Sequence, residues 1–307
     1  MKNSKFQAVP SRKLALFEGL IVSMIWASSF VLVKMVLPHL GPLTIAGLRY
    51  SIAFLILLPF VLRKRKQPVV LTPRLWGIFM IMGLSAYTIG NGAMFWGLKY
   101  LSATTTSFLL SITPVIVLFP SALWLKEVPS RWQTLGVLIS IIGSALFFSP
   151  GIEKGQLIGF AIMGVGLIGF TTFGILTRSV ARERKVDTLT LTTIPLGIGG
   201  CVLMLIALPM EGWPTAPAQA WGIVFWLAVV NTAVGYMLYN HALQVLTALE
   251  MNMLQNLSPF ETVFIAWLLL GERLNGLQIA GMGIVIVGVM VVQQLRRSPE
   301  RTGFPES

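Results

Sequence analysis

The sequence predicts an all-α integral membrane protein in which ten transmembrane helices form two inverted five-helix repeats. Three observations lead to this prediction: the apolar composition, ten apolar stretches of spanning length, and a segment that occurs twice. Of the 307 residues, 55% are hydrophobic and only 11% are charged. A soluble globular protein carries about 25% charged residues. The composition therefore indicates a chain embedded in lipid.

Each apolar run is close to the twenty residues that span a bilayer as a helix. The first run is longer than the 7–15-residue core of a signal peptide and lacks a small-residue cleavage site, so we expect it to be retained. The fifth run is short, and tilt or bilayer thinning would accommodate it. In chain order, the expected helices are Leu14–Val36, Pro42–Leu62, Leu75–Trp96, Ala103–Leu125, Trp132–Phe148, Gln156–Thr177, Leu189–Leu208, Ala220–Tyr239, Leu246–Leu270 and Leu277–Leu295.

The repeat is visible without a gap between Ser111–Phe147 and Asn256–Val292, where ten of 37 positions are identical. Because each copy holds five helices, an odd number, the second copy enters the membrane with the opposite orientation. Inverted repeats allow two similar packings, one open to each side, which is the basis of alternating access. The matched pairs, all 145 positions apart, include Pro114 and Pro259, Glu127 and Glu272, Gln133 and Gln278, Gly136 and Gly281, and Gly143 and Gly288.

These boundaries divide the chain into residues 1–13, repeats 14–150 and 151–295, and a tail 296–307. With the N-terminus inside, 18 of the 23 Lys and Arg residues fall on the cytoplasmic side and four on the outer side. This bias predicts cytoplasmic termini in an inner-membrane protein. It also accounts for the net charge of +12 without nucleic-acid binding. The single cysteine, Cys201, excludes an internal disulfide and a cysteine-based metal site.

The motifs around the repeated prolines resemble the EamA-like family of the drug/metabolite transporter superfamily. The first reads S-I-T-P with L-K-E after it, and the second reads L-S-P with L-L-L-G-E-R-L after it, each followed by glycines seven apart. The first helix, with I-W-A-S-S-F-V, and Arg49 in the second helix fit as well. The resemblance covers about Leu14–Gln293. It implies a ten-helix secondary transporter, often an exporter of amino acids, other metabolites or drugs, with a central cavity lined by both halves.

Two charged residues inside the predicted helices are the first candidates for function. Glu261 lies near the middle of the ninth helix and departs from the family pattern, where many relatives have an apolar or small residue. A carboxylate at that depth costs at least about 2.5 kcal/mol, so it should face a cavity or a partner. It is a candidate proton carrier, a candidate anchor for a substrate amine, or part of a structural ion pair. Arg49 is its candidate partner, and its planar fork also suits a substrate carboxylate.

Polar and aromatic residues at helical spacing suit the lining of a cavity, or else hydrogen bonds between helices. We expect Pro114 and Pro259 to kink their helices. We expect Glu127 and Glu272, just after the fourth and ninth helices, to act as structural or gating groups that bind carbonyls or basic groups at the start of the next helix. Glu18, near the start of the first helix, can complement the dipole of that helix. His241, near the cytoplasmic end of the eighth helix, is either a pH-sensing group or a solvated imidazole. The residues assigned to the substrate pathway are Trp26, Ser29, Arg49, Tyr87, Asn91, Ser107, Ser111, Tyr236, Asn240, Asn252, Asn256 and Glu261.

We therefore expect a secondary transporter that moves a small metabolite, first of all an amino acid, across the inner membrane, with export as the expected direction. No P-loop is present, so ATP should not drive it directly. The expected partners are the substrate and the lipid bilayer, with no cofactor and no metal. Proton coupling, facilitated diffusion and the oligomeric state stay open. The alternatives are an uptake permease or a multidrug exporter of the same fold, a membrane protein that does not transport, and an intramembrane lipid-modifying enzyme. An enzyme would normally show a dense group of His, Asp or Glu residues near one interface.

Overall fold

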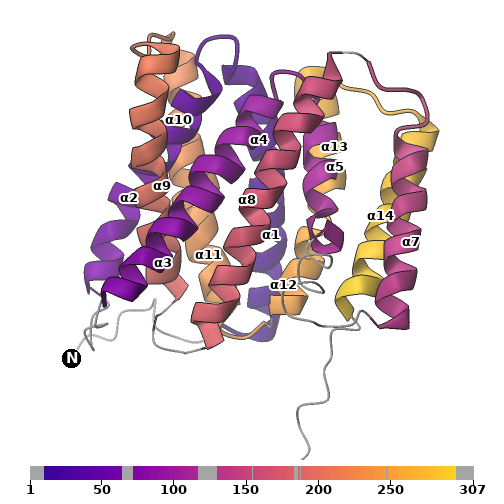
Figure 1. Cartoon of the computed structure of the whole chain (residues 1–307), viewed down its shortest axis with the longest axis horizontal. Coiled ribbons are helices and arrows are strands. Elements are labelled where there is room, and N and C mark those ends of the chain that lie inside the picture. The colour runs from indigo at the N-terminus through magenta and orange to yellow at the C-terminus, as the bar shows by residue number, and fades with distance from the viewer. Residues whose placement is uncertain are drawn as a thin grey trace, which may run out of the picture. The chain divides into compact units, whose positions relative to one another are not determined.

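The structure is a computed structural model that describes residues 10–63, 72–116, 130–153, 155–182, 186, 188–246 and 248–294. These residues form helices and connecting turns, and none of them lies in a strand (Figure 1). In chain order the helices are α1 (Arg12–Val36), α2 (Pro42–Arg63), α3 (Pro73–Gly83), η2 (Leu84–Asn91), α4 (Gly92–Gly97), α5 (Ala103–Ser111), α7 (Arg131–Phe147), α8 (Gln156–Arg182), α9 (Thr188–Glu211), α10 (Ala218–Ala228), η3 (Val229–Val234), α11 (Gly235–Ala242), α12 (Ala248–Gln255), α13 (Ser258–Leu270) and α14 (Gly276–Gln294).

The all-helical, membrane-embedded class predicted from the sequence is confirmed. Within the described residues, seven helical stretches are long and apolar enough to cross a membrane. Three shorter apolar helices, Ala103–Ile116, Arg131–Phe147 and Gly276–Val292, accompany them. Each of the ten expected helices overlaps one of these stretches. The number of crossings and the inverted repeat remain predictions.

The chain divides into two compact units, which we describe separately. The large unit comprises Met1–Leu110 and Ile152–Arg273, and the small unit comprises Ser111–Gly151 and Leu274–Ser307. In the large unit, α1 packs against α10, α11, α12 and α13, while α2 packs against α9. Its main core contains fully buried side chains from several helices, including Ile45, Tyr87 and Leu196. This packing holds α1 and α2 in place against the helices of the second half of the chain. It thereby positions the polar residues described below.

Two helices of the large unit contain a π-helical turn, η2 between α3 and α4, and η3 between α10 and α11. These turns begin at Leu84 and Val229, which are 145 positions apart, the same offset as the sequence repeat. A π-turn releases backbone carbonyls from the usual α-helical pattern, and such turns occur often at functional sites. Polar side chains satisfy two of these carbonyls: the Asn91 amide donates to Ala86 O at 2.8 Å and the Thr232 hydroxyl to Leu227 O at 2.9 Å.

The ninth expected helix is interrupted. The sequence predicts a continuous helix over Leu246–Leu270, whereas the structure has α12, a turn at Asn256 and Leu257, and then α13. Pro259 lies in the first turn of α13. Proline lacks the N–H that the helix interior requires, and it is tolerated at this position because the first N–H groups have no intrahelical partner. In the small unit, a turn at Ile112 likewise precedes Pro114.

The small unit is built on α7 and α14, which pack directly against each other (Figure 1). A Cβ added to Gly136 or Gly143 would lie 2.7 Å from Gly288 O or Gly281 O, respectively. The paired glycines therefore permit an antiparallel contact between the two helix backbones. The repeated glutamines are also explained. Gln133 closes a capping box with Ser130 at the start of α7, and Gln278 makes the reciprocal bonds with Asn275 at the start of α14.

Candidate substrate site in the large unit

Arg49 is buried in the large unit, with only 5% of its surface exposed. Its Nε donates to Thr232 Oγ1 at 2.7 Å and its Nη1 donates to the Ser29 hydroxyl. Its Nη2 donates to Asn231 O at 3.3 Å. All three acceptors are neutral oxygens, and no carboxylate among the described residues lies within ion-pair distance of the guanidinium. A buried charge without a counter-ion is costly, so Arg49 is suited to bind an anionic group.

The π-turn η3 positions two of these partners. Thr232 is held by its bond to Leu227 O and accepts from Arg49. The amide nitrogen of Asn231 donates to Ile25 O and, at 2.9 Å, to Ser28 Oγ. The side-chain oxygen of Asn231, Oδ1, is buried without a hydrogen-bond partner among the described residues. The turn therefore joins η3 to α1 and α2, and it leaves one buried acceptor beside the Arg49 site.

Aromatic rings surround this polar group. The Arg49 guanidinium lies 5.3 Å from the centre of the Tyr50 ring and 5.7 Å from the centre of the Phe95 ring. Both distances are within cation–π range. We call the connected rings the aromatic cluster. The remaining contacts are Tyr50–Tyr87 at 5.1 Å, Tyr87–Phe173 at 6.1 Å, Trp26–Tyr236 at 5.6 Å and Trp26–Tyr239 at 5.4 Å between ring centres.

The Tyr87 and Tyr236 hydroxyls lie 3.4 Å apart, so they join η2 to α11. This contact brings together the two halves of the sequence, because the residues belong to the third and eighth expected helices. Both tyrosines were assigned to the substrate pathway from the sequence. The structure places them in the aromatic cluster with Trp26.

Glu261 lies in the first turn of α13 and is half-buried. Its carboxylate accepts a hydrogen bond from Ser23 of α1 at 2.6 Å. A negative charge is favourable at this position because the N-terminus of a helix carries a partial positive charge. Arg49 contacts α1 at Ser29, six residues after Ser23, which corresponds to a rise of about 9 Å. The structure therefore gives Arg49 and Glu261 different partners, with Trp26 midway between them along α1.

The other predicted pathway residues have varied surroundings. Ser107 is buried, and its Oγ lies 3.1 Å from Thr262 Oγ1. The Asn240 amide has neither its nitrogen nor its oxygen in a hydrogen bond. Asn252 is exposed on α12, whereas Asn256 is buried at the turn before α13. Ser111 is the last residue of α5 and the first of the small unit. Glu127 lies outside the described residues.

Glu272 binds the start of α5. Its carboxylate accepts from the Ala103 and Thr104 N–H groups at 2.9 and 3.1 Å and from the Thr104 hydroxyl at 2.8 Å. Gly271, with φ of 69°, ends α13 in the left-handed region that favours glycine and directs the chain to this contact. From the sequence, we expect Glu272 to contact carbonyls or basic groups at the next helix instead. The N–H groups at the start of α5 are otherwise without intrahelical partners.

Lys34, near the end of α1, binds the connection between α4 and α5. Its Nζ donates to Leu98 O at 2.9 Å and to Leu101 O. These carbonyls follow α4, where a positive charge is favourable. Lys34 and Glu272 together therefore hold both sides of the connection between α4 and α5.

Glu211 makes a similar contact that the sequence analysis does not identify. Its carboxylate accepts from the N–H groups of Leu43 and Thr44 at 3.0 and 2.8 Å, at the start of α2. A Cβ at Gly41 would lie 2.1 Å from this carboxylate, so glycine leaves the space that Glu211 occupies. The sequence feature that marks the residue is a lone carboxylate at the end of an apolar helix, followed by Gly212.

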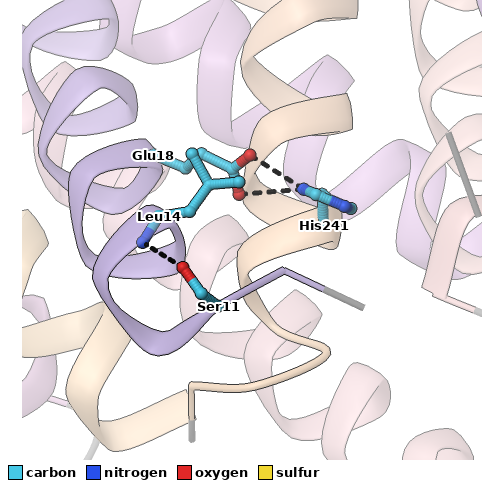
Figure 2. A network of polar contacts seen from close by, with 4 residues as sticks. All are labelled: Ser11, Leu14, Glu18 and His241. Carbon is cyan, nitrogen blue, oxygen red and sulfur yellow. Dashed lines mark hydrogen bonds and ion pairs between the residues drawn. The ribbon is translucent and has the colours of Figure 1, made fainter. Parts of the chain in front are cut away.

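Glu18 and His241 form a contact that the sequence analysis also does not predict. The His241 Nδ1 lies 2.8 and 3.0 Å from the two Glu18 carboxylate oxygens, so that α1 and α11 are joined (Figure 2). Glu18 is buried, with 7% of its surface exposed. The sequence places each of these residues near a helix end, where a side chain is usually solvated. It does not show that α1 and α11 pack closely enough for the two side chains to meet.

The fold and the site define a class before any comparison. Long apolar helices with buried polar and charged side chains in their midst are typical of membrane transporters, since such groups mark substrate and ion pathways. The sequence profile described as the EamA-like transporter family matches residues 13–149 and again residues 157–293. The chain therefore belongs to the EamA-like transporter family, as the resemblance in the sequence predicts.

Characterised and uncharacterised relatives carry the same class name. The "Uncharacterized transporter YyaM" of Bacillus subtilis is 24% identical over 91% of this chain and 93% of its own. The "S-adenosylmethionine/S-adenosylhomocysteine transporter" of Chlamydia trachomatis serovar L2 is 24% identical over 92% of this chain and 90% of its own. The "Probable terminal-alkyne amino-acid exporter" of Streptantibioticus cattleyicolor is 26% identical over 88% and 90%. The family and these names indicate a transporter and not an enzyme.

A solved crystal structure has the same fold. It superposes with a TM-score of 0.67 over 94% of this chain and 99% of its own, at 15% sequence identity. This likeness concerns the fold alone.

Proposed function

We propose that this protein is a secondary transporter that moves an amino acid, or a metabolite with an amino-acid head group, across the inner membrane by alternating access. Export is the proposed direction, with both termini cytoplasmic. The observation behind the proposal is the environment of Arg49, a buried guanidinium whose partners are neutral oxygens and aromatic rings. A substrate carboxylate would supply the missing negative charge, because the guanidinium fork matches a carboxylate in two-point hydrogen bonding.

Two charged side chains along α1 suit opposite charges on a substrate. Arg49 at the level of Ser29 suits the carboxylate of the head group, and Glu261 at the level of Ser23 suits an amine farther along the substrate, because the two serines are separated by about 9 Å of helix rise. Trp26, which lies between these levels and contacts Tyr236 and Tyr239, suits the apolar part of the substrate. Two relatives support this substrate class, since one is named for S-adenosylmethionine and the other for an amino acid.

Alternating access requires two similar halves, and three observations support an arrangement of ten helices as repeats 14–150 and 151–295. The family profile matches the chain twice, with starts 144 residues apart. The π-turns η2 and η3 begin 145 residues apart. Helix interruptions precede Pro114 and Pro259 at the same offset. Equivalent backbone irregularities on both sides of the molecule are what an inverted repeat would provide for opening at either face.

The test is exchange of labelled amino acids in proteoliposomes at equal pH inside and outside. We expect saturable exchange of at least one amino acid by the wild type. Arg49→Gln should abolish it, and Arg49→Lys should weaken it strongly because an ammonium group lacks the planar fork. Arg273→Gln is the matched control, since Arg273 is exposed after Glu272. If no amino acid is exchanged, or if Arg49→Gln exchanges as well as the wild type, the proposal fails.

A further inference from the structure

The Glu18–His241 pair is buried but remains reachable from water. The carboxylate side chain is 9% exposed and the imidazole side chain is 26% exposed. Both carboxylate oxygens lie within hydrogen-bond distance of one ring nitrogen (Figure 2). Glu18 lies six residues after the start of α1, about 9 Å along the helix axis. A proton can therefore reach the imidazole from the end of the large unit where α1 begins.

One proton makes this pair neutral as a whole. With that proton the pair is an imidazolium beside a carboxylate, or a neutral imidazole beside a carboxylic acid. Removing it leaves a carboxylate that is almost fully buried, with no compensating charge from its partner, which is costly. Histidine is the side chain whose ordinary charge change lies between pH 5 and 8. The pair therefore offers two adjacent groups, a carboxylate and an imidazole, between which one proton can be held.

The described helices that pack around the pair carry few other ionisable side chains. On α12, Glu250 is neutralised by Arg12 of α1 at 2.5 Å. On α13, Glu261 is bonded to Ser23, five residues beyond Glu18. The titratable groups on α11 besides His241 are Tyr236 and Tyr239, which contact Trp26. The sequences of α10 and η3, which also pack on α1, contain no ionisable side chain. The helix α9 also packs on α11. Its titratable groups are Cys201 and Glu211, and Glu211 is the last residue of α9.

The helices that the pair joins also contribute to the candidate substrate site. Trp26 lies eight residues after Glu18 on α1, and Tyr236 lies five residues before His241 on α11. The two rings are in contact, 5.6 Å between centres. Any change in the distance between α1 and α11 that follows loss of the proton therefore changes the contact between Trp26 and Tyr236 as well. Proton binding and substrate binding thus act on one helix pair.

We propose that Glu18 and His241 form the binding site of a proton that is exchanged for the substrate, and that Glu261 serves the substrate instead. This inference rests on the proposed transport function. In exchange, the substrate leaves in one direction while a proton enters in the other, bound by the imidazole–carboxylate pair and released when α1 and α11 separate. Neutralising Glu18 should therefore remove the coupling to protons while leaving the substrate site in place.

The experiment compares two modes of transport in the same proteoliposomes. The probe is the labelled amino acid that the wild type exchanges most rapidly. Exchange at equal pH needs only the substrate site, whereas accumulation of the substrate driven by a pH gradient also needs the proton site. A gradient of one pH unit is equivalent to about a tenfold concentration ratio for one exchanged proton. We expect the wild type to accumulate substrate towards this ratio, and Glu18→Gln and His241→Gln to exchange it without accumulating it.

Two further variants complete the design. Glu250→Gln removes a carboxylate from the same end of the large unit and should accumulate substrate like the wild type. Glu18→Asp retains a proton-binding carboxylate and should restore part of the accumulation. Each protein is first checked for monodispersity on size exclusion, so that a variant that fails to fold is replaced by the other member of the pair.

Each outcome has a defined meaning. Absence of exchange by the wild type overturns the proposed function and, with it, this inference. Exchange by the wild type without pH-driven accumulation leaves the proposed function in place and overturns the proton site. Accumulation by Glu18→Gln at the wild-type level also overturns the proton site. So does loss of both modes in every folded variant of the pair, because the pair would then be structural.

Discussion

Arg49 and Glu261 are the two residues whose placement within the membrane most constrains the function. Both are charges in predicted spanning helices, yet the structure connects them to α1 at different levels. Arg49 donates to Ser29, and Glu261 accepts from Ser23. Each side chain is therefore stabilised by a serine of the same helix rather than by the opposite charge. In the proposed function, both charges are then available to a substrate that carries one group of each sign.

A double-mutant cycle tests the separation of these residues. Because Arg49 and Glu261 have different partners, the stability losses of Arg49→Gln and Glu261→Gln should add within about 0.5 kcal/mol. The measurement is thermal unfolding of the wild type, both single variants and the double variant in the same detergent. Ser23→Ala with Glu261→Gln is the positive control, since this pair is in direct contact and should be non-additive. Additive losses in the control, or a much smaller combined loss for Arg49 and Glu261, would contradict the structure.

The sequence identifies such residues only when the free-energy cost of burying them depends on their own position and not on their neighbours in space. An ionisable side chain in an apolar run is recognisable because lipid penalises it wherever its neighbours lie, and Arg49 and Glu261 were identified in this way. Their partners could not be predicted, since Thr232 is 183 positions from Arg49 and Ser23 is 238 from Glu261. Glu18 and His241 were underestimated for the same reason, because only the packing of α1 against α11 buries them together.

At the scale of elements, one contact occurs twice: a glutamate carboxylate binds the first N–H groups of a helix. Glu211 binds the first N–H groups of α2, and Glu272 binds those of α5. Each carboxylate satisfies donors that would otherwise be unpaired in or near lipid. Each also meets the positive end of the helix dipole. These contacts fix the starts of α2 and α5 through backbone N–H donors.

The close contact of α7 and α14 gives an element-scale prediction within the small unit. Gly143→Ala should lower the melting temperature, because its Cβ would lie 2.7 Å from Gly281 O and Val285 N, both backbone atoms that cannot move aside alone. We expect a loss of about 1–3 kcal/mol from overpacking. Gly283→Ala is the matched control on α14, since a Cβ there meets nothing within 4 Å. Equal melting temperatures for the two variants would contradict this packing.

The sequence predicts where the helices lie, but it does not predict where a helix is interrupted or contains a π-turn. The apolar length of each run predicts a helix, and the structure has a helix over each of the ten runs. The π-turns η2 and η3 have no proline or charge that marks them, and they are stabilised by contacts such as the Thr232–Arg49 bond from another helix. The interruption before Pro259 had a local cause, proline itself, but the sequence suggested a kink where the structure has a complete turn.

At the scale of the whole molecule, the two ends of the large unit are held together by different chemistry. Where α1 ends, carboxylates and Lys34 bind backbone groups, as at Glu272 and Thr104. Where α1 begins, side chains bind side chains, in the Arg12–Glu250 and Glu18–His241 pairs. Of these two pairs, Arg12–Glu250 is the more exposed, with 65% of the Arg12 side chain accessible. Exposed ion pairs contribute little stability, typically below about 1 kcal/mol, so the contact between α1 and α12 is easy to separate.

Alternating access therefore predicts that fixing the end where α1 begins will stop transport. In a background with Cys201→Ala, we would introduce Arg12→Cys and Glu250→Cys, whose native side chains lie in contact between α1 and α12. A short bismaleimide that links the two cysteines should abolish substrate exchange, because α1 and α12 could no longer separate. Each single-cysteine variant treated with a monofunctional maleimide is the control and should keep exchanging. Exchange that persists after complete cross-linking would mean that α1 and α12 stay together throughout the transport cycle, and the opening would then have to occur between other helices.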